Sequence, residues 1–451
     1  MRSRVSRSAA SGALALVMVV ASAATTAAAQ GEPPTAASSV PTSPSPPAAP
    51  PAAEEHWYDT VKFEAFVDAY TNVNYNFPKP QGGTNQYRAP DVNNGFALTW
   101  VGLDVVHEAK PVGGTISLRF GPASSLFAGA DTQYGLEYVR QAFATWKPTD
   151  RLALDLGKFD TICCAEVPDS QKNMNYTRGI LYWVAEPLFH TGLRASYQVT
   201  DEVTFRLMAV NGWNNTIDNN LGKSFGAQIG VAPIKQLSGN VTYIGGPERN
   251  DTMSVTCPAG QAYSVDAYAC VNQTGATGGA PQTVEDKKAN GRWRQFVDAL
   301  VNYNPTDSLA FALNGDFGYD TALDPLTGSE RAVYWYGAMA AGRLAFNEVW
   351  AVALRGEWFR DPQGFMTGAT NPTSGNPLDV IIRTGTLTLE AKPSPYLIVR
   401  LENRIDSANQ PVYRRGLTDA NDVQVTSLLG VVVTTGHTFN APTSPAAPAP
   451  K

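Results

Sequence analysis

Long apolar runs are missing from most of this sequence. After the N-terminal segment, no stretch stays apolar for the roughly 20 residues that a membrane-spanning helix needs. Yet hydrophobic residues make up 43% of the chain, charged residues only 16%, and 39 residues are glycine. This composition argues against a helical membrane protein and indicates a chain rich in strands and turns.

A strong charge of either sign is also missing. The chain has 34 Lys and Arg against 40 Asp and Glu, a formal charge of −6. Removing an N-terminal leader with three Arg and no acid leaves 31 − 40 = −9. A mild acidic excess of this kind disfavours nucleic acid as a partner.

Signatures of catalysis and of metal binding are scarce. None of the four His has a Ser neighbour at the spacing of a barrel lipase, although a triad assembled from distant strands stays open because triads are recognised by geometry. Asp218, Asn219 and Asn220 lack the fuller spacing of a calcium loop and suit a turn. No Gly-rich phosphate loop precedes a helix. We therefore expect no enzyme activity, no cofactor and no metal.

Cysteine is rare, with four residues, all in segments that we assign to loops. In an oxidising compartment the expected pairing is a disulfide between Cys257 and Cys270 that closes a small loop. The neighbours Cys163 and Cys164 leave three alternatives open: a vicinal disulfide, free thiols or metal ligands. No second pair stands at the spacing of zinc ligands.

The two ends of the chain differ from its middle. Residues 1–29 carry Arg2, Arg4 and Arg7 before the apolar run ALALVMVV, which is typical of a secretory signal peptide. A membrane-anchor helix is the competing interpretation, but the apolar core is too short for a span. Residues 30–56, rich in Pro, Ala and Ser, predict a disordered linker, and residues 441–451 a Pro/Ala-rich tail. The folded part is therefore expected over residues 57–440.

Apolar and polar side chains alternate through that folded part. Leu152, Leu154 and Leu156 share one face of an extended segment that has Asp155 on the other, and this pattern predicts a strand with one apolar face. Short turns and longer loops join such segments alternately, which is typical of a membrane β-barrel. Counting them predicts an all-β fold, a transmembrane antiparallel β-barrel of about 16 strands with both ends on the short-turn side. The expected turns are residues 109–114, 147–150, 199–202, 233–236, 304–307, 346–348 and 392–395, and the expected loops are residues 77–94, 121–133, 160–189, 211–222, 246–290, 320–331, 361–378 and 408–422.

The middle of the chain resembles a known family. The segments GKF (157–159), NMNYTRG (173–179), EPLFHTGLR (186–194) and VNGWNNTIDNN followed by KS (210–224) are similar to those of the OmpL-like β-barrel porin family. The similarity runs from FVDAYTNVNYN (66–76) to the final strand. It implies an outer-membrane barrel of porin type, and it transfers neither a substrate nor a catalytic residue. The vicinal cysteines depart from the pattern expected for this loop.

Aromatic residues near the predicted strand ends suit the two interfaces of a membrane. A buried sandwich core would also hold large aromatics, but the opposite face of each strand is too polar for that alternative. The residues expected in these girdles are Trp100, Trp146, Trp293, Tyr303, Trp350, Trp358 and Tyr396.

Charged residues of both signs occupy the face opposite to the apolar one. They would line the lumen and create a transverse field that orients small polar solutes. The alternative is that arginines and acids pair across neighbouring strands and hold the wall together. The expected pore-lining residues are Arg119, Arg140, Asp155, Arg194, Arg206, Arg294, Asp298, Arg355, Glu357, Arg400, Glu402 and Arg404.

The loop at 160–189 is the expected constriction of the lumen. It is long, lies in the block with the strongest resemblance, and contains Glu166, Asp169, Lys172 and Arg178. General porins narrow their pores with an infolded loop, and this is an analogy. A solvated outer loop is the alternative.

These patterns predict an outer-membrane porin, a passive channel for small hydrophilic solutes and ions. A non-conducting barrel that acts as an anchor, adhesin or receptor through its outer loops is the second hypothesis, and an exported soluble β protein the third. The expected location is the outer membrane of a bacterial cell. The expected partners are outer-membrane lipid and small polar solutes and ions, with a homo-oligomer left open.

Overall fold

The computed structural model describes residues 60–435 except 80–84 and 325–328. The expected signal peptide, the linker and the C-terminal tail lie outside these residues. Among the described residues, no helix combines the length and apolar character needed to cross a bilayer. The described residues belong to one compact unit.

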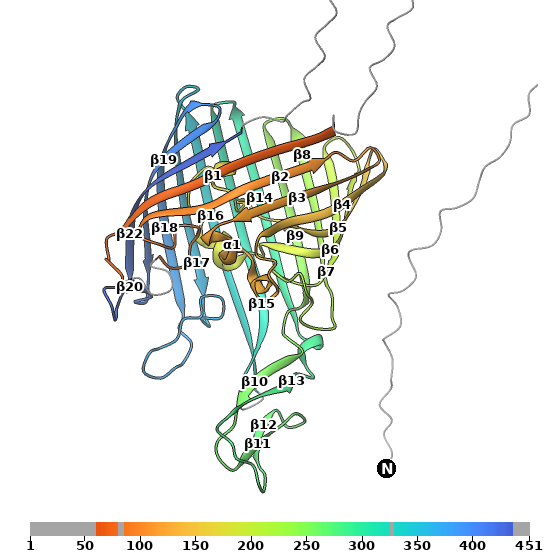
Figure 1. Ribbon diagram of the computed structural model, residues 1–451, viewed down its shortest axis with the longest axis vertical. Helices are drawn as coiled ribbons and strands as arrows, with labels where there is room; N and C mark the ends of the chain where they lie inside the picture. Colours follow the sequence, from red (N-terminus) through yellow and green to blue (C-terminus); the bar gives the residue numbers. More distant parts are fainter. Residues whose placement is uncertain (1–59, 80–84, 325–328, 436–451) are drawn as a thin grey trace, which may run out of the picture. The chain divides into compact units, whose positions relative to one another are not determined.

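Sixteen strands close into one antiparallel barrel (Figure 1), so the strand count predicted from the sequence is confirmed. Each strand pairs with its neighbour in chain order, except where small two-stranded sheets intervene between β9 and β14 and between β19 and β22. Closure comes from β1, which pairs with β2 on one side and with β22 on the other. The strands of the barrel are β1 (Val61–Asn74), β2 (Gly95–His107), β3 (Val112–Phe120), β4 (Val139–Thr149), β5 (Leu152–Asp160), β6 (Phe189–Gln198), β7 (Val203–Val210), β8 (Ser224–Ile234), β9 (Leu237–Pro247), β14 (Trp293–Thr306), β15 (Leu309–Leu323), β16 (Glu330–Ala345), β17 (Trp350–Asp361), β18 (Val380–Ser394), β19 (Leu397–Ala408) and β22 (Val423–Thr434).

Short turns alternate with long loops along the barrel, as the sequence predicts. The chain enters β1 and leaves β22 on the side of the short turns. The expected sixth loop is shorter than predicted, because β15 and β16 continue to pair as far as Leu323 and Glu330. The loops are named L1 (75–94), L2 (121–138), L3 (161–188), L4 (211–223), L5 (248–292), L6 (324–329), L7 (362–379) and L8 (409–422).

The outer face of the wall is apolar and exposed. On β16 and β17, Leu344 and Leu354 are exposed, whereas Ala353 and Arg355 beside them are buried. Such alternation is what a lipid-facing wall requires. Among the expected girdle residues the exposed ones are Trp146, Trp293, Tyr303, Trp350 and Tyr396.

Trp100 is a correction to the predicted girdle. It is 0% exposed and packs inside the barrel, with its ring 5.1 Å from that of Phe127. The register between β1 and β2 shifts beside it, where Asp68 pairs with Trp100 but Ala69 pairs with Leu98. A bulge of this kind reverses the face that a side chain occupies, which strict alternation cannot foresee.

Two hydrophobic clusters lie inside the barrel. One gathers Phe159, Phe296, Trp335 and Phe359 of the wall around Leu181 of L3. The other gathers Phe66 and Trp100 of the wall with Tyr176 of L3 and Phe127 of α1 (Pro122–Phe127) in L2. In this part the interior is a packed core.

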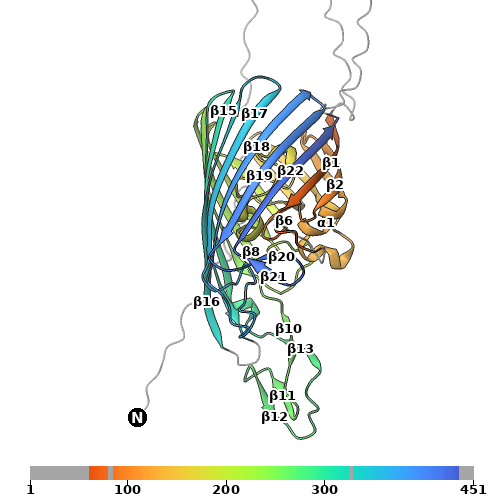
Figure 2. The same cartoon turned by 90° about the vertical axis from the view of Figure 1, so that its left-hand side faces the viewer.

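L5 forms an outer extension of two hairpins (Figure 2), in which β10 (Thr252–Thr256) pairs with β13 (Pro281–Glu285) and β11 (Gln261–Ser264) with β12 (Ala269–Asn272). The structure joins Cys257 to Cys270 beside the smaller hairpin, with an S–S distance of 2.05 Å. Cys163 and Cys164 are joined as a vicinal disulfide. The cross-link in L5 closes a small loop that has little hydrophobic core of its own.

Glu248 ties the start of L5 to L4. Its carboxylate accepts hydrogen bonds from the Ser224 hydroxyl at 2.6 Å and the Trp213 amide at 2.8 Å. Burial raises the pKa of Glu248 to about 7 from its ordinary 4.5, although Arg294 nearby opposes the shift. The folded state therefore holds this proton more tightly than the unfolded chain does.

We predict that Glu248 makes the barrel more stable at low pH. For an acid whose folded pKa is raised, the stabilisation is fully present below about pH 4.5 and is lost as the pH rises through 7. The effect is at most about 3 kcal/mol for a shift of this size. Thermal unfolding of wild type and Glu248→Gln in detergent at pH 5 and pH 8 checks this, since only wild type should lose this contribution. The same pH dependence in both proteins would contradict it.

Candidate functional site

L3 runs inside the barrel. Short helical segments of the loops that follow β3 and β5 lie between the front strands and the back strands in Figure 1. L3 contains a 3₁₀ turn (Ser170–Lys172) and a π-helical turn (Leu181–Ala185). Tyr176, Thr177, Arg178 and Ile180 of L3 are 0% exposed. Backbone groups at such depth need partners on the wall.

Arg119 on β3 forms the first anchor of L3. Its guanidinium bonds to both carboxylate oxygens of Asp104 on the wall, at 2.9 and 3.1 Å, and to both of Asp169 in L3, at 2.9 and 2.8 Å. Burial alone would raise the pKa of Asp169, but Arg119 and Lys172 hold it well below its ordinary value. Two bidentate contacts of this kind fix both the distance and the orientation of Asp169 relative to the wall.

Arg355 on β17 forms the second anchor. It donates at 2.6 Å to Glu166 and at 2.6 Å to the carbonyl of Thr177, and it pairs with its wall neighbour Glu357 at 3.1 Å. Glu166 in turn accepts from the Gly179 amide at 2.6 Å. Arg355 therefore holds two points of L3 that are distant from each other along the loop.

Arg400 on β19 forms the third anchor, through main-chain atoms of L3. Its guanidinium donates to the carbonyls of Ser170, Asn173 and Asn175 at 2.5, 2.8 and 3.1 Å. Glu390 on β18 balances the charge at 2.6 Å. One side chain thus satisfies three buried acceptors.

Glu402 and Arg404, also on β19, hold the next part of the loop. Glu402 accepts from the amides of Tyr176 and Thr177 at 2.6 and 3.1 Å. Arg404 donates at 2.7 Å to the carbonyl of Arg178 and pairs with Asp406 at 2.7 Å. The inward face of β19 therefore provides hydrogen-bond donors and acceptors that fix the position of the L3 backbone.

A glycine in the wall makes room for the aromatic centre of L3. A Cβ atom at Gly430 on β22 would lie 2.3 Å from the ring of Tyr176. The hydroxyl of Tyr176 donates to Asp68 on β1 at 2.5 Å. The loop therefore packs against the seam where the barrel closes.

The predicted pore-lining residues all face inward, and they fall into two groups, one partly buried and one buried. Arg194, Arg206 and Arg294 are only partly buried. Arg194 pairs with Asp155 at 2.8 Å and Arg294 with Asp320 at 2.8 Å, whereas Arg206 donates a hydrogen bond to Gln228. Arg140 pairs with Asp160 at 2.6 Å. The buried ones are Arg119, Arg140, Asp155, Asp298, Arg355, Glu357, Arg400, Glu402 and Arg404.

Of the four residues predicted in the constriction, Asp169 and Arg178 are buried, Glu166 is partly buried and Lys172 is exposed. Arg178 donates to the Ser170 hydroxyl at 2.8 Å and so links L3 to itself. Its amide donates to the carbonyl of Ala89 in L1 at 2.7 Å. L3 is thus anchored to the wall and to L1.

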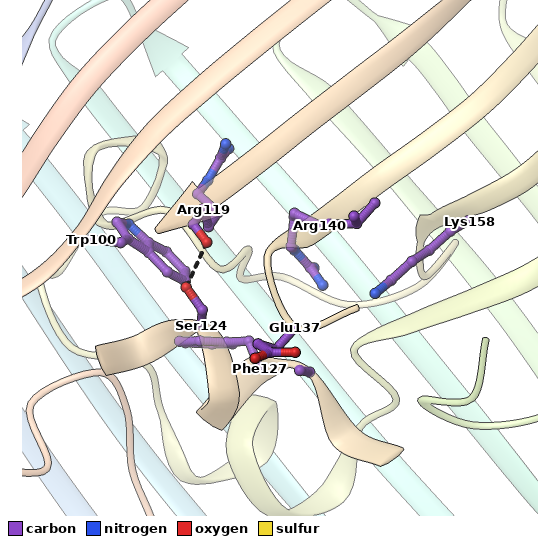
Figure 3. A pocket seen from close by; sticks show the side chains of 9 residues that line it. Trp100, Arg119, Ser124, Phe127, Glu137, Arg140 and Lys158 are labelled. Carbon is purple, nitrogen blue, oxygen red and sulfur yellow. Dashed lines mark hydrogen bonds between the residues drawn. The ribbon is translucent and has the colours of Figure 1, made fainter. Parts of the chain in front are cut away.

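A small pocket lies between L2 and the wall. Arg119, Arg140 and Lys158 line it together with Trp100 and Glu137 (Figure 3), and its volume is about 10 Å³. This is the size of a single water molecule. The pocket is therefore too small for a solute larger than water.

Several residues of the site carry no sequence signal. Asn173, Asn175 and Tyr176 belong to the segment NMNYTRG, which marks the family but not their contacts, whereas Ser170 and Trp335 lie in no such segment. The alternating pattern identifies inward-facing charges, as for Asp298 and Glu402. It cannot identify their partners in L3.

Comparison with solved structures finds several chains that are similar to this one. The OmpF complex with daunomycin from Salmonella typhi is 11% identical, with a TM-score of 0.52, and the match covers 84% of this chain and 99% of that one. An anion-selective porin from Comamonas acidovorans is 12% identical, with a TM-score of 0.49, covering 83% and 99%. The outer-membrane protein OmpT of Vibrio cholerae is 10% identical, with a TM-score of 0.49, covering 83% and 97%. At these identities the likeness concerns the fold alone.

Comparison of the sequence with family models identifies the family of this chain. No curated protein matches it. The family model described as "Putative beta-barrel porin-2, OmpL-like" matches residues 60–434. That range begins just before β1 and ends with β22, so it covers the whole barrel together with L3. The chain belongs to this OmpL-like family of β-barrel porins.

Proposed function

We propose that this protein is a passive channel of the bacterial outer membrane, without enzymatic chemistry, in which L3 narrows the path of small hydrophilic solutes and ions. The observation that carries the proposal is the anchoring of L3 inside the barrel by Arg119, Arg355 and Arg400. A loop fixed by buried guanidinium groups keeps its position while solutes pass beside it, because breaking a buried pair costs about 3–5 kcal/mol.

We further propose that the channel favours anions. In several ion pairs of the interior the cation is the more exposed partner: 26% for Arg343 against 3% for Glu390, 44% for Lys172 against 7% for Asp169, and 18% for Arg294 against 3% for Asp320. Arg140 and Asp160 show the reverse order, at 5% and 32%. In the deeply buried pairs of Arg119 with Asp104 and of Arg355 with Glu166 the acid is also the more exposed partner, at 12% against 3% and 10% against 1%. Selectivity depends on the charges that solutes meet, and these are mainly positive.

A non-conducting barrel is the second candidate. The observations in its favour are the two hydrophobic clusters and the buried charge pairs that occupy the interior around L3. In that case the protein would act through its outer loops, above all L5. Electrical measurement separates the two candidates.

The apolar outer face suits outer-membrane lipid. A hollow of about 670 Å³ lies over β14 to β17, and its lining includes Val301, Leu313 and Leu354 together with the small residues Ala340 and Gly342. An acyl chain or a second copy of the chain fits this surface. A homo-oligomer stays a prediction.

We predict that Arg400→Ala enlarges the channel. The substitution leaves the carbonyls of Ser170, Asn173 and Asn175 without their donor, so L3 should loosen and single-channel conductance in a planar bilayer should rise and fluctuate. Arg383→Ala on the exposed face of β18 is the matched control and should conduct like wild type. Stepwise openings in wild type support a pore. If neither folded wild type nor folded Arg400→Ala shows any conductance, the porin proposal is overturned in favour of a closed barrel.

We predict an anion-selective reversal potential under a salt gradient. Lys172→Gln, which removes the most exposed of these cations, should shift the potential toward cation selectivity. Lys287→Gln makes the same chemical change in L5, where Lys287 pairs with Asp266, and should leave the potential unchanged. A cation-selective wild type would refute the assignment.

A further inference from the structure

Three carboxylates converge where the end of L3 meets β14 and β15. Asp298 and Asp316 are directly opposite in the register of the two strands, and Glu186 follows the π-helical turn of L3. They are 0%, 5% and 6% exposed. Asp316 lies within hydrogen-bonding reach of both others, and oxygens of Glu186 and Asp298 lie within 4.8 Å of each other.

This cluster lacks the cation that accompanies the other buried acids of L3. In the part of the chain that the structure describes, no Arg, Lys or His forms an ion pair with any of the three carboxylates. Their hydrogen-bond donors are the Cys164 amide, 3.3 Å from Asp298, and the Asn314 amide nitrogen, 2.6 Å from Asp298 and 3.1 Å from Asp316. Like charges opposite each other on paired strands are destabilising. Buried charges are normally paired or coordinate a metal.

Unpartnered oxygens in the same place provide an independent observation. Asp316 Oδ2, Glu186 Oε2 and the amide oxygen Asn314 Oδ1 are buried without a hydrogen-bond partner. Asn314 is a neutral side chain, only 5% exposed, whose amide group contacts both aspartates. Buried acceptors of this kind cost free energy unless something satisfies them.

The donor set identifies the class of ligand. Carboxylate and amide oxygens are the ligands of hard divalent cations such as Ca²⁺ and Mg²⁺. The sulfur of Cys164 lies next to the cluster but is held in the disulfide with Cys163, so it offers no thiolate to a soft metal. The sequence predicted no metal, because Glu186, Asp298 and Asp316 form no spaced motif.

We propose that Glu186, Asp298 and Asp316 bind one hard divalent cation of the Ca²⁺ class, and that the Asn314 amide turns over so that its oxygen takes the place of its nitrogen beside the two aspartates. The cation fastens the C-terminal part of L3 to β14 and β15, just as Arg355 and Arg400 fasten its N-terminal part to β17 and β19. This role is independent of whether the lumen conducts.

Calcium titration of the full chain tests the site. The protein is refolded in detergent, treated with a chelator and titrated with Ca²⁺ by calorimetry, then separately with Mg²⁺. We expect one Ca²⁺ per wild-type chain. Asp316→Asn should lose at least tenfold in affinity, because mutation of residues that only support the ligands of a metal already costs about 10–100-fold. Asp379→Asn is the matched control, since Asp379 pairs with Arg360 in L7, and it should bind like wild type.

Two further measurements guard against misfolding of the strand variant. Glu186→Gln changes only L3 and should also weaken Ca²⁺ binding. Tb³⁺ bound in the site should luminesce through Trp335, whose indole donates to the carbonyl of Ala185 at 3.0 Å, and Ca²⁺ should displace it. Wild type that binds neither Ca²⁺ nor Mg²⁺ would overturn the proposal and leave protons as the neutralising species. Equal Ca²⁺ binding by wild type, Asp316→Asn and Glu186→Gln would overturn it as well.

Discussion

The satisfaction of buried backbone groups governs the interior of this barrel. A loop can lie inside a wall of strands only if its amides and carbonyls find partners there. Arg400 gives three donors to the carbonyls of L3, and Glu402 accepts from two of its amides. These two side chains thus satisfy backbone groups of L3 by hydrogen bonds, as neighbouring strands satisfy those of one another.

The charges of the wall therefore have two distinct tasks. Arg119, Arg355 and Arg400 are buried and hold L3 in place, whereas Arg194, Arg206 and Arg343 remain partly open to solvent. In the pairs of Arg194 with Asp155 and of Arg343 with Glu390, the carboxylate is the more buried partner.

The architecture could be predicted from the sequence, and the contacts of L3 could not. Alternation in segments such as Leu152 to Leu156 fixes one face of each strand toward lipid, and the spacing of turns fixes the number of strands. Pairings such as Arg400 with Asn175 join residues 225 positions apart, and neither pattern nor composition reports on such contacts. The bulge beside Trp100 shows a second limit, because one extra residue moves a side chain to the other face.

The same limit applies to the predicted lumen. Alternation places Arg355, Glu357 and Glu402 on the inner face, and the structure has them there. Whether such side chains meet water or loop atoms depends on the course of L3. Glu166, Asp169 and Arg178 marked L3 as polar, but a solvated outer loop has the same composition.

Amide hydrogen exchange of L3 tests the central claim most directly. If Glu402 and Arg400 hold the loop inside the barrel, the amides of Tyr176 and Thr177 should exchange as slowly as those of β19, and Glu402→Gln should speed their exchange. The amides of L5, outside the barrel, should exchange quickly in both proteins. Exchange of Tyr176 and Thr177 as fast as that of L5 in folded wild type would show that L3 does not occupy the lumen, and would contradict the account.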